Sequence, residues 1–218
     1  MHNSLTNLQE IKEEIYSKNI NDNNSVKIIA VTKTFKMDKI TPLIDDGHIH
    51  FGENKVQEAV NKWTALKTSN ENLKLHMIGK LQKNKVKYVI PLFDYIHSLD
   101  SLELAEKIFI EQKKKNKNLK LFIQVNIGNE KQKGGVNTEE LFNFYEICKT
   151  KLNLNIIGLM CIPPQGIDIN TYFSSMKNLN SSLGLEELSM GMSADYMDAI
   201  KHKSTFVRIG SKIFGDRV

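Results

Sequence analysis

Short runs of apolar, mostly β-branched residues alternate along this chain with longer segments whose apolar residues recur every three to four positions. The first pattern is typical of strands and the second of amphipathic helices. The run Val26–Thr32 is apolar at nearly every position, as expected of a strand that is covered on both faces. The pattern predicts eight strands, at Val26–Thr32, Ile49–Gly52, Leu73–Met77, Tyr95–His97, Leu119–Asn126, Asn155–Met160, Glu187–Met190 and Phe206–Ile209.

Helical patterns fill the intervals between these strands. An extra helix is expected at Leu5–Lys18, before the first strand, because Leu5, Leu8, Ile11 and Ile15 fall on one face. Eight strand–helix units within about 200 residues favour a single (β/α)8 TIM barrel over an open doubly wound sheet. The intervening helices are expected at Met37–Asp45, Lys55–Thr68, Lys83–Ile90, Ser101–Lys115, Thr138–Thr150, Ile169–Leu183 and Ser193–Lys201.

Composition narrows the class of protein. With 218 residues, 40% of them hydrophobic and 25% charged, the chain fits one globular domain over residues 1–218. Cys148 and Cys161 stand far apart without a CxxC pattern, which suits a reducing compartment. The polar N-terminus lacks the apolar core of a signal peptide, and no apolar stretch is long enough to cross a bilayer. We therefore expect a cytoplasmic protein with no membrane partner.

The charge balance is mildly positive. The net charge is +5, from 30 Lys and Arg against 25 Asp and Glu, and part of the excess is the run Lys113–Lys115 at the end of a predicted helix. Lysines in that position favour the helix dipole and solubility. A nucleic-acid-binding module would need a basic stripe with aromatic residues or a known motif, and the sequence has neither. We expect no nucleic-acid partner, although the charge can help to attract a phosphorylated small molecule.

Two loops near the end of the chain predict an anion site. In TIM barrels the ligand lies at the C-terminal ends of the strands, and the loops after strands 7 and 8 frequently hold a phosphate. Ser193 resembles an N-cap that opens a helix, with Asp195 in the first turn. Gly210 offers a backbone that a ligand can approach, and Ser211 adds a hydroxyl donor. An ordinary capped helix followed by a turn glycine is the alternative.

Lys33 and Arg208 close the first and the last predicted strands, at the same mouth. Burial and a nearby cation would lower the pKa of the Lys33 amine, as Schiff-base formation requires, whereas a solvated strand-end lysine is the alternative. A guanidinium beside a pyridine nitrogen would disfavour protonation of the ring, whereas an arginine paired with a carboxylate is the alternative. A phosphate site opposite a desolvated lysine is the combination that pyridoxal 5′-phosphate (PLP) requires.

The histidines give a weaker signal. His48 and His50 share a face if both lie on a strand, but a metal site needs a third ligand at a suitable spacing, and none presents itself. His76 and His97 each stand at a strand end, where we expect polar members of the core and not general bases. We therefore expect no metal site.

Taken in order, the segments at the strand ends resemble the YggS/PROSC family of PLP homeostasis proteins, which is related to the N-terminal barrel of alanine racemase. The most specific matches are FGENKVQE at 51–58 and SMGMS at 189–193, and the resemblance covers essentially the whole chain. Met37, four residues after the lysine, departs from true racemases, which have a tyrosine there that contacts the phosphate. The other matches are AVTKT at 30–34, HMIGKLQKNK at 76–85, QVNI at 124–127, GLM at 158–160 and VRIGSKIFG at 207–215.

The resemblance implies a set of cofactor-binding residues: Lys33, Asn54, Ile78, Met192, Ser193, Arg208, Gly210 and Ser211. By this resemblance Lys33 carries PLP covalently as an aldimine, and Ser193, Gly210 and Ser211 hold the phosphate. Arg208 then lies near the pyridine nitrogen. Asn54 approaches the cofactor from the second strand, while Ile78 and Met192 line the pocket.

The resemblance also implies a carrier and not an efficient enzyme, so that no catalytic residue is expected. The protein would take part in PLP homeostasis, holding the aldehyde on Lys33 and supplying it to apo PLP-dependent enzymes, since an incoming amine can exchange with the lysine. A weak PLP-dependent racemase is the alternative, disfavoured because no second domain follows the eighth unit to supply a second base. A Schiff-base aldolase shares the lysine and the phosphate site but usually carries its lysine on a later strand. The lack of a second domain also suggests a monomer.

Overall fold

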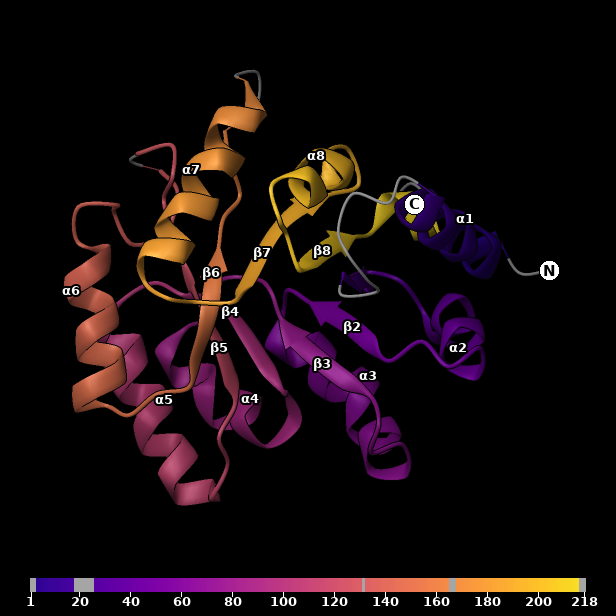
Figure 1. Ribbon diagram of the computed structural model, residues 1–218. Helices are drawn as coiled ribbons and strands as arrows, with labels where there is room; N and C mark the ends of the chain where they lie inside the picture. The colour runs from indigo at the N-terminus through magenta and orange to yellow at the C-terminus, as the bar shows by residue number, and fades with distance from the viewer. Residues whose placement is uncertain (1–2, 18–25, 131, 165–167, 216–218) are drawn as a thin grey trace.

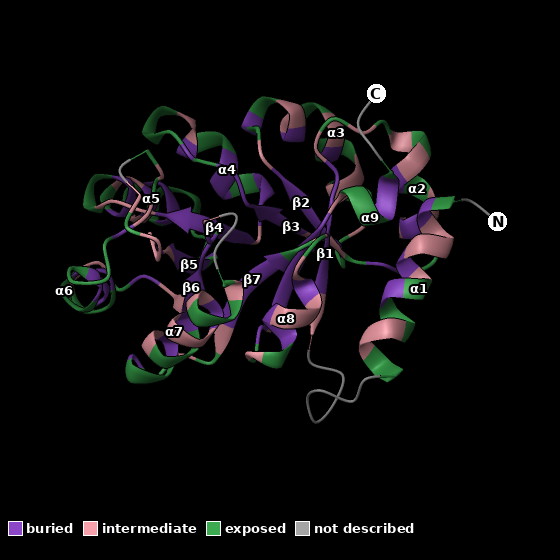
Figure 2. Cartoon of the chain, turned by 90° about the horizontal axis from the view of Figure 1, so that it is seen from above, coloured by how far each residue is buried: buried purple, intermediate pink, exposed green. Residues whose placement is uncertain are grey.

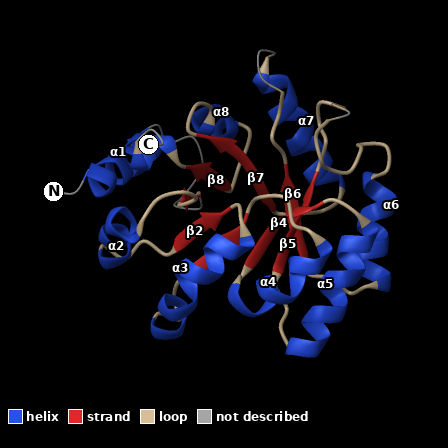
Figure 3. Cartoon of the chain, turned by 180° about the vertical axis from the view of Figure 1, so that it is seen from behind, coloured by secondary structure: helices blue, strands red, loops and turns tan. Residues whose placement is uncertain are grey.

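The structure, a computed structural model, describes residues 3–17, 26–130, 132–164 and 168–215. Eight parallel strands pair in chain order and close into a barrel, which confirms the predicted fold class (Figure 1). From behind, the strands are seen enclosed by the helices (Figure 3). The strands are β1 (Lys27–Val31), β2 (His50–Glu53), β3 (Lys74–Met77), β4 (Tyr95–Leu99), β5 (Lys120–Gln124), β6 (Ile156–Met160), β7 (Glu187–Met192) and β8 (Phe206–Ile209).

The helices largely follow the predicted intervals, and the N-terminal helix is present. The end of that predicted helix, Lys18, lies outside the described residues. The interval predicted as one helix at Thr138–Thr150 begins as an α-helix only at Leu141 and widens into a π-helix from Ile147. The helices are α1 (Asn3–Ser17), α2 (Met37–Asp45), α3 (Val56–Ser69), 3-10 helix η1 (Lys83–Lys85), α4 (Val86–Leu92), α5 (Leu102–Lys115), α6 (Leu141–Glu146), π-helix η2 (Ile147–Lys151), α7 (Ile169–Ser182), α8 (Tyr196–Lys201) and α9 (Ser211–Phe214).

Strand ends differ from the prediction where polar residues interrupt the apolar pattern. β4 continues past His97 to Leu99, because Ser98 is buried although its side chain is polar. β5 stops at Gln124, and Val125 keeps one isolated bridge to Val136. Period-two patterns locate a buried strand well, but its ends depend on partners elsewhere in the chain.

Aromatic and imidazole rings fill the inside of the barrel. His76 stacks on Tyr95 with ring centroids 4.2 Å apart, and His97 stacks on Phe122 at 4.3 Å. Phe206 lies edge-on to Phe122 at 5.3 Å. Both histidines are fully buried, which confirms their assignment to the polar core. The barrel centre is therefore a packed layer of rings and not a pore.

His48 lies before β2 and not on it, so that it does not form a strand pair with His50. The His48 ring bonds instead to the His50 carbonyl, with Nε2 and O 2.9 Å apart. Among the described residues, no three His, Cys, Asp or Glu side chains are grouped so that they could hold a metal ion.

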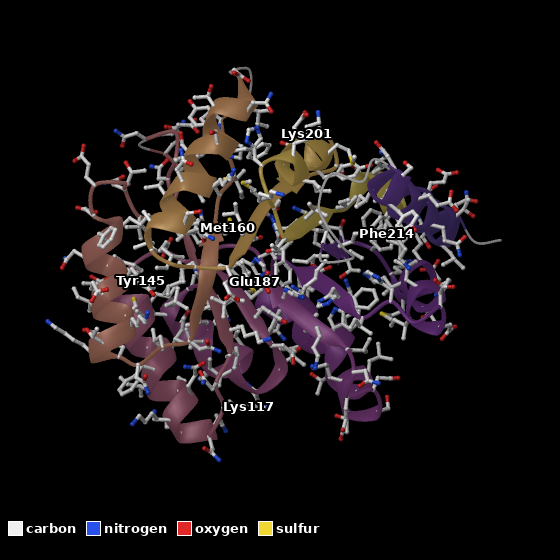
Figure 4. All side chains as sticks on the ribbon, viewed as in Figure 1. Lys117, Tyr145, Met160, Glu187, Lys201 and Phe214 are labelled. Atoms are coloured by element: carbon white, nitrogen blue, oxygen red, sulfur yellow. The ribbon has the colours of Figure 1, made fainter. Side chains whose placement is uncertain are left out.

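The helices cover the barrel with their apolar sides, so that buried residues gather around the strands and exposed ones face outward (Figure 2). Figure 4 labels Lys117 and Lys201 at the periphery and Met160 among the strands. α1 buries Leu8 and Ile11, two of the residues predicted on its apolar face, and packs against α2 and α9. No helix within the described ranges is long and apolar enough to cross a membrane.

The ring layer should carry much of the stability. Phe206 is fully buried, so Phe206→Ala should lower the free energy of unfolding by about 3–5 kcal/mol, from lost burial and the cavity that remains. Phe142 on α6 is 56% exposed, and Phe142→Ala should change it by less than about 0.5 kcal/mol. Urea unfolding followed by circular dichroism compares the two variants, and equal losses would contradict a rigid inner layer.

Candidate cofactor site

A cavity of about 290 Å³ opens at the C-terminal mouth of the barrel, beside β1, β7 and β8. It brings together every residue that the sequence analysis assigned to the cofactor: Lys33, Asn54, Ile78, Met192, Ser193, Arg208, Gly210 and Ser211. The sequence analysis missed the remaining lining residues, Val31, Phe35, Ile162, Ala194 and Gly215. Most of them lie within the quoted motifs or beside an assigned residue, so that motif context could have indicated them.

The turn after β1 presents Lys33 to the cavity. Thr34 follows with φ of 69°, a left-handed conformation that is rare for a β-branched residue. Its N–H donates to Glu58 Oε1 at 2.6 Å, so that α3 holds the turn. Phe35 then packs on Phe214 of the last helix, with ring centroids 4.9 Å apart. The lysine therefore stands on a backbone that is fixed from both sides.

Glu53, at the end of β2, ties this turn to α3. Its Oε1 accepts hydrogen bonds from Thr32 Oγ1 at 2.7 Å, Lys62 Nζ at 2.8 Å and Trp63 Nε1 at 3.0 Å. Lys62 Nζ also donates to the Thr32 carbonyl at 2.8 Å and to Glu58 at 3.0 Å. Glu53 is fully buried, and three donors converge on its Oε1. The two glutamates of the FGENKVQE motif thus act as positioning residues, a role that the sequence analysis did not assign.

Asn54 follows directly and offers an unused acceptor. Its Oδ1 is buried and has no hydrogen-bond partner in the described part of the chain. Buried polar atoms are nearly always satisfied, so an orphan at a cavity wall is suited to a ligand. Gly79 packs tightly behind it, since a Cβ there would lie 2.4 Å from the Asn54 carbonyl oxygen. Any larger residue at position 79 would displace the backbone of Asn54.

The loop after β7 departs from the predicted helix cap. α8 begins at Tyr196, with Asp195 and not Ser193 at the N-cap, so the assignment of Ser193 as a cap is wrong. The physical reason is that β7 runs on to Met192, which leaves Ser193 in a turn. Its Oγ accepts instead from the N–H of Gly210 at 3.3 Å and of Lys212 at 3.4 Å. These two bonds join the loops after β7 and β8 into one polar wall.

Gly191 allows α8 to approach β7 closely. It has φ of +92°, and a Cβ there would lie 2.6 Å from Ala199 Cβ. Gly210, by contrast, has φ of −117°, which any residue can adopt, and a Cβ there would meet Val31 at 3.4 Å. Gly191, unlike Gly210, therefore requires glycine for its backbone conformation.

The last helix is braced from the other end of the chain. Lys212 Nζ donates to Glu14 at 2.8 Å and to the Tyr196 hydroxyl at 2.6 Å, and this hydroxyl also donates to Glu14. Asn7 Nδ2 donates to the Ile213 carbonyl at 2.9 Å. α1 therefore holds the short helix that follows Gly210 against the barrel.

Arg208 is buried with 5% exposure and forms no ion pair among the described residues. Among these residues, Arg208 therefore does not form the carboxylate pair that the sequence analysis gave as the alternative. Nη1 donates to the carbonyl and the hydroxyl of Ser189, both at 2.8 Å, and Nη2 donates to the Cys161 carbonyl at 2.8 Å. Burial lowers the pKa of the guanidinium, although a guanidinium stays protonated in proteins. Burial also raises the pKa of the Cys161 thiol to about 12, so that it remains protonated.

These groups fit the chemistry of PLP. Hydroxyl and backbone N–H groups at Ser193 and Ser211 suit a phosphate, the amine of Lys33 suits an aldehyde, and Arg208 suits an unprotonated ring nitrogen. Apolar side chains such as Ile78 cover the remaining wall. The volume lies near the lower end of the about 300–1,000 Å³ common for small-molecule sites.

Comparison with known proteins identifies relatives across nearly the whole chain. The sequence model of the family described as alanine racemase, N-terminal domain, matches residues 6–218. The pyridoxal phosphate homeostasis protein of Aquifex aeolicus is 39% identical over 203 residues, which cover 89% of this chain and 88% of that protein. The protein of the same name from Haemophilus influenzae is 37% identical and covers 97% of this chain and 94% of its own length.

Solved structures agree with these relatives. PipY of Synechococcus elongatus, solved without PLP, has a TM-score of 0.84 and 33% identity, covering 93% of this chain and 99% of that one. The same protein with PLP bound has a TM-score of 0.82 and 32% identity, covering 94% and 100%. Alanine racemase of Clostridium difficile shares the fold alone, with a TM-score of 0.75 at 17% identity over 56% of its chain. With a family match over almost its full length and relatives above 30% identity, this chain belongs to the pyridoxal phosphate homeostasis proteins of the alanine racemase N-terminal domain family.

Proposed function

We propose that this chain binds PLP as a Schiff base on Lys33 and supplies it to apo PLP-dependent enzymes. The observation that carries the proposal is that an amine, a polar wall and a buried guanidinium converge in one cavity. The relatives, which are pyridoxal phosphate homeostasis proteins, and the PLP-bound structure of PipY support it. When bound, PLP supplies a reactive aldehyde that exchanges between amines.

Each residue has a defined part in this proposal. Lys33 attaches the aldehyde through Nζ, and the Glu53–Glu58 network keeps its turn in place. Ser193, Gly210 and Ser211 bind the phosphate with hydroxyl and N–H donors at the joined loops. Asn54 and Arg208 contact polar atoms of the ring, while Ile78 and Met192 exclude water from its faces.

The described lining of the cavity offers no base opposite Lys33, which supports a carrier. Racemisation moves a proton on both faces of the ring, so a base is needed opposite the lysine. Among the described residues that line the cavity, Lys33 and Arg208 are the ionisable ones, and a guanidinium is a poor base. A weak racemase-like activity therefore stays the second candidate.

The proposal extends to location and assembly. Cys148 and Cys161 are both unpaired and buried, which suits the reducing cytoplasm. The residues proposed to bind PLP, from Lys33 to Ser211, all belong to this chain, and we propose that the protein acts as a monomer.

Replacing Lys33 tests the attachment. Wild-type protein mixed with PLP should develop a yellow absorption band that borohydride removes, and Lys33→Ala should abolish the band because no amine remains to form the Schiff base. Lys80→Ala removes an exposed lysine near the mouth and should leave the band unchanged. A borohydride-sensitive band that persists in Lys33→Ala would place the attachment elsewhere. No band in the wild type under saturating PLP would overturn the proposed function.

Replacing Ser193 tests the phosphate wall. Ser193→Ala removes a hydroxyl that a charged phosphate would use, together with the hydrogen bond that this hydroxyl accepts from the Gly210 N–H. Hydrogen bonds to charged groups contribute about 1.5–3 kcal/mol, so the Kd for PLP should rise about 10- to 100-fold. Ser181→Ala, at an exposed serine of α7, is the matched control and should leave Kd unchanged in an absorbance titration. If Ser193→Ala bound PLP with the same Kd as Ser181→Ala, Ser193 would not be part of the phosphate site.

The carrier role predicts transfer. PLP-loaded protein, freed of unbound PLP by gel filtration, should restore activity to an apo-aminotransferase, because an incoming lysine can displace Lys33. The measurement is aminotransferase activity against time, with Lys33→Ala taken through the same loading as the control. Failure to restore activity would contradict the supply role. Formation of D-alanine by the loaded protein at about 1 s⁻¹ or faster would favour the racemase instead.

A further inference from the structure

A chain of hydrogen bonds crosses the inside of the barrel and ends at Arg208. His50 Nδ1 and His76 Nε2 are 2.9 Å apart, as are His76 Nδ1 and His97 Nε2. His97 Nδ1 lies 2.9 Å from Ser189 Oγ, which Arg208 Nη1 contacts at 2.8 Å. The members stand on β2, β3, β4, β7 and β8, so the chain spans the barrel.

This chain of hydrogen bonds connects the two ends of the barrel. His50 is the first residue of β2 and is partly exposed at the N-terminal end of the barrel. His76, His97 and Ser189 are fully buried, and Arg208 lines the cavity at the opposite end. The interior of the barrel therefore holds a continuous polar path from its N-terminal end to the candidate cofactor site.

The hydrogen bonds of this series all run in one direction, each residue donating to the next from Arg208 to His50. A guanidinium only donates, so Ser189 Oγ accepts from Arg208. The acceptor that the described residues offer to the Ser189 hydroxyl proton is His97 Nδ1. A neutral His97 then carries its proton on Nε2 and donates to His76 Nδ1, and His76 in turn donates from Nε2 to His50 Nδ1. The opposite tautomer of His97 would leave a buried hydroxyl proton without an acceptor, which is costly.

The surroundings keep these imidazoles neutral. Burial lowers the pKa of His76 and His97 well below the usual value, and burial together with nearby lysines lowers the pKa of His50 to about 4. The charged groups near His50 are Lys27, Lys74 and Lys120 at the starts of β1, β3 and β5, with Asp94 acting in the opposite sense. Arg208 likewise disfavours a charge on His97.

The hydrogen-bond chain also helps to stabilise the buried guanidinium of Arg208. Buried charges are usually paired, yet Arg208 has no carboxylate partner in the described part of the chain. A series of aligned donors polarises along its length, so that the Ser189 oxygen becomes a better acceptor for the guanidinium. Of five N–H groups, three are used by Ser189 and Cys161, which leaves two (5 − 3) for a ligand.

We propose that Ser189, His97, His76 and His50 are positioning residues that act through Arg208: they form a one-directional hydrogen-bond chain, with all three imidazoles as neutral Nε2–H tautomers, that orients the guanidinium toward the cofactor. The proposal rests on the proposed function, because the cavity beside Arg208 is the PLP site. Ordinary ring packing would require neither a fixed tautomer nor an effect of Ser189 on the cofactor.

The first test needs no ligand. Nitrogen NMR of ¹⁵N-histidine-labelled wild-type protein without cofactor should show Nε2–H tautomers for all three residues, unchanged between about pH 5 and pH 8. His50→Gln, His76→Gln and His97→Gln, made one at a time, assign the signals. An Nδ1–H tautomer or a fast mixture at His97 or His76 would overturn the proposal without touching PLP binding.

The second test links the chain to the cofactor. Ser189→Ala removes the donor to His97 Nδ1, so an Nδ1–H population of His97 should appear, the absorption band of bound PLP should shift, and Kd should rise about 10-fold. The matched control is Ser98→Ala, which removes a buried hydroxyl beside His97 that has no hydrogen-bond partner among the described residues. If both variants bind PLP like the wild type, the proposal fails while the proposed function stands. If the wild type binds no PLP, the proposed function fails instead.

Discussion

Parallel pairing of β1 with β8 is the constraint on which the site depends. The register places Ile29 beside Arg208 and Ala30 beside Ile209, so the C-terminal ends of the first and last strands lie together. Lys33 follows one of these ends and Gly210 the other, although about 180 residues separate them in sequence. An open sheet of the same strands would leave the amine at one edge and the polar wall at the other. Barrel closure thus makes one site from two halves.

Two buried charges flank this closure, and they do not pair with each other. Oε1 of Glu53 accepts from Thr32, Lys62 and Trp63, and Arg208 donates to Ser189 and Cys161. Because each charge has its own partners, the glutamate holds the backbone of the lysine turn while the guanidinium keeps donors for a ligand. This arrangement requires several additional polar residues in the interior of the barrel.

The period of the apolar pattern was sufficient to predict the barrel, because strands covered on both faces read as continuous apolar runs. The cavity residues could be named because motifs at the strand ends fall at one mouth in any such barrel. The N-cap at Ser193 was predicted wrongly, since a local cap signal cannot reveal that β7 continues to Met192. The roles of Glu53 and Ser189 could not be predicted either. Their partners are set by packing across the barrel, and neither residue has a local sequence signature for it.

The brace between α1 and α9 has a consequence for the order in which the molecule forms. Asn7 and Ile213 are 206 residues apart in sequence, and Glu14 and Lys212 are 198 apart. During synthesis α1 and its neighbour α2 are made before β2, whereas α9 is made only after β8, so the contacts of α1 with α9 form much later than those with α2. Contacts between such distant residues form slowly, because the entropy of closing the long loop is lost before any stabilising contact forms. The newly made chain therefore passes through a stage in which seven strands are present, α1 lies beside α2 but without α9, and the two halves of the cofactor site have not yet met.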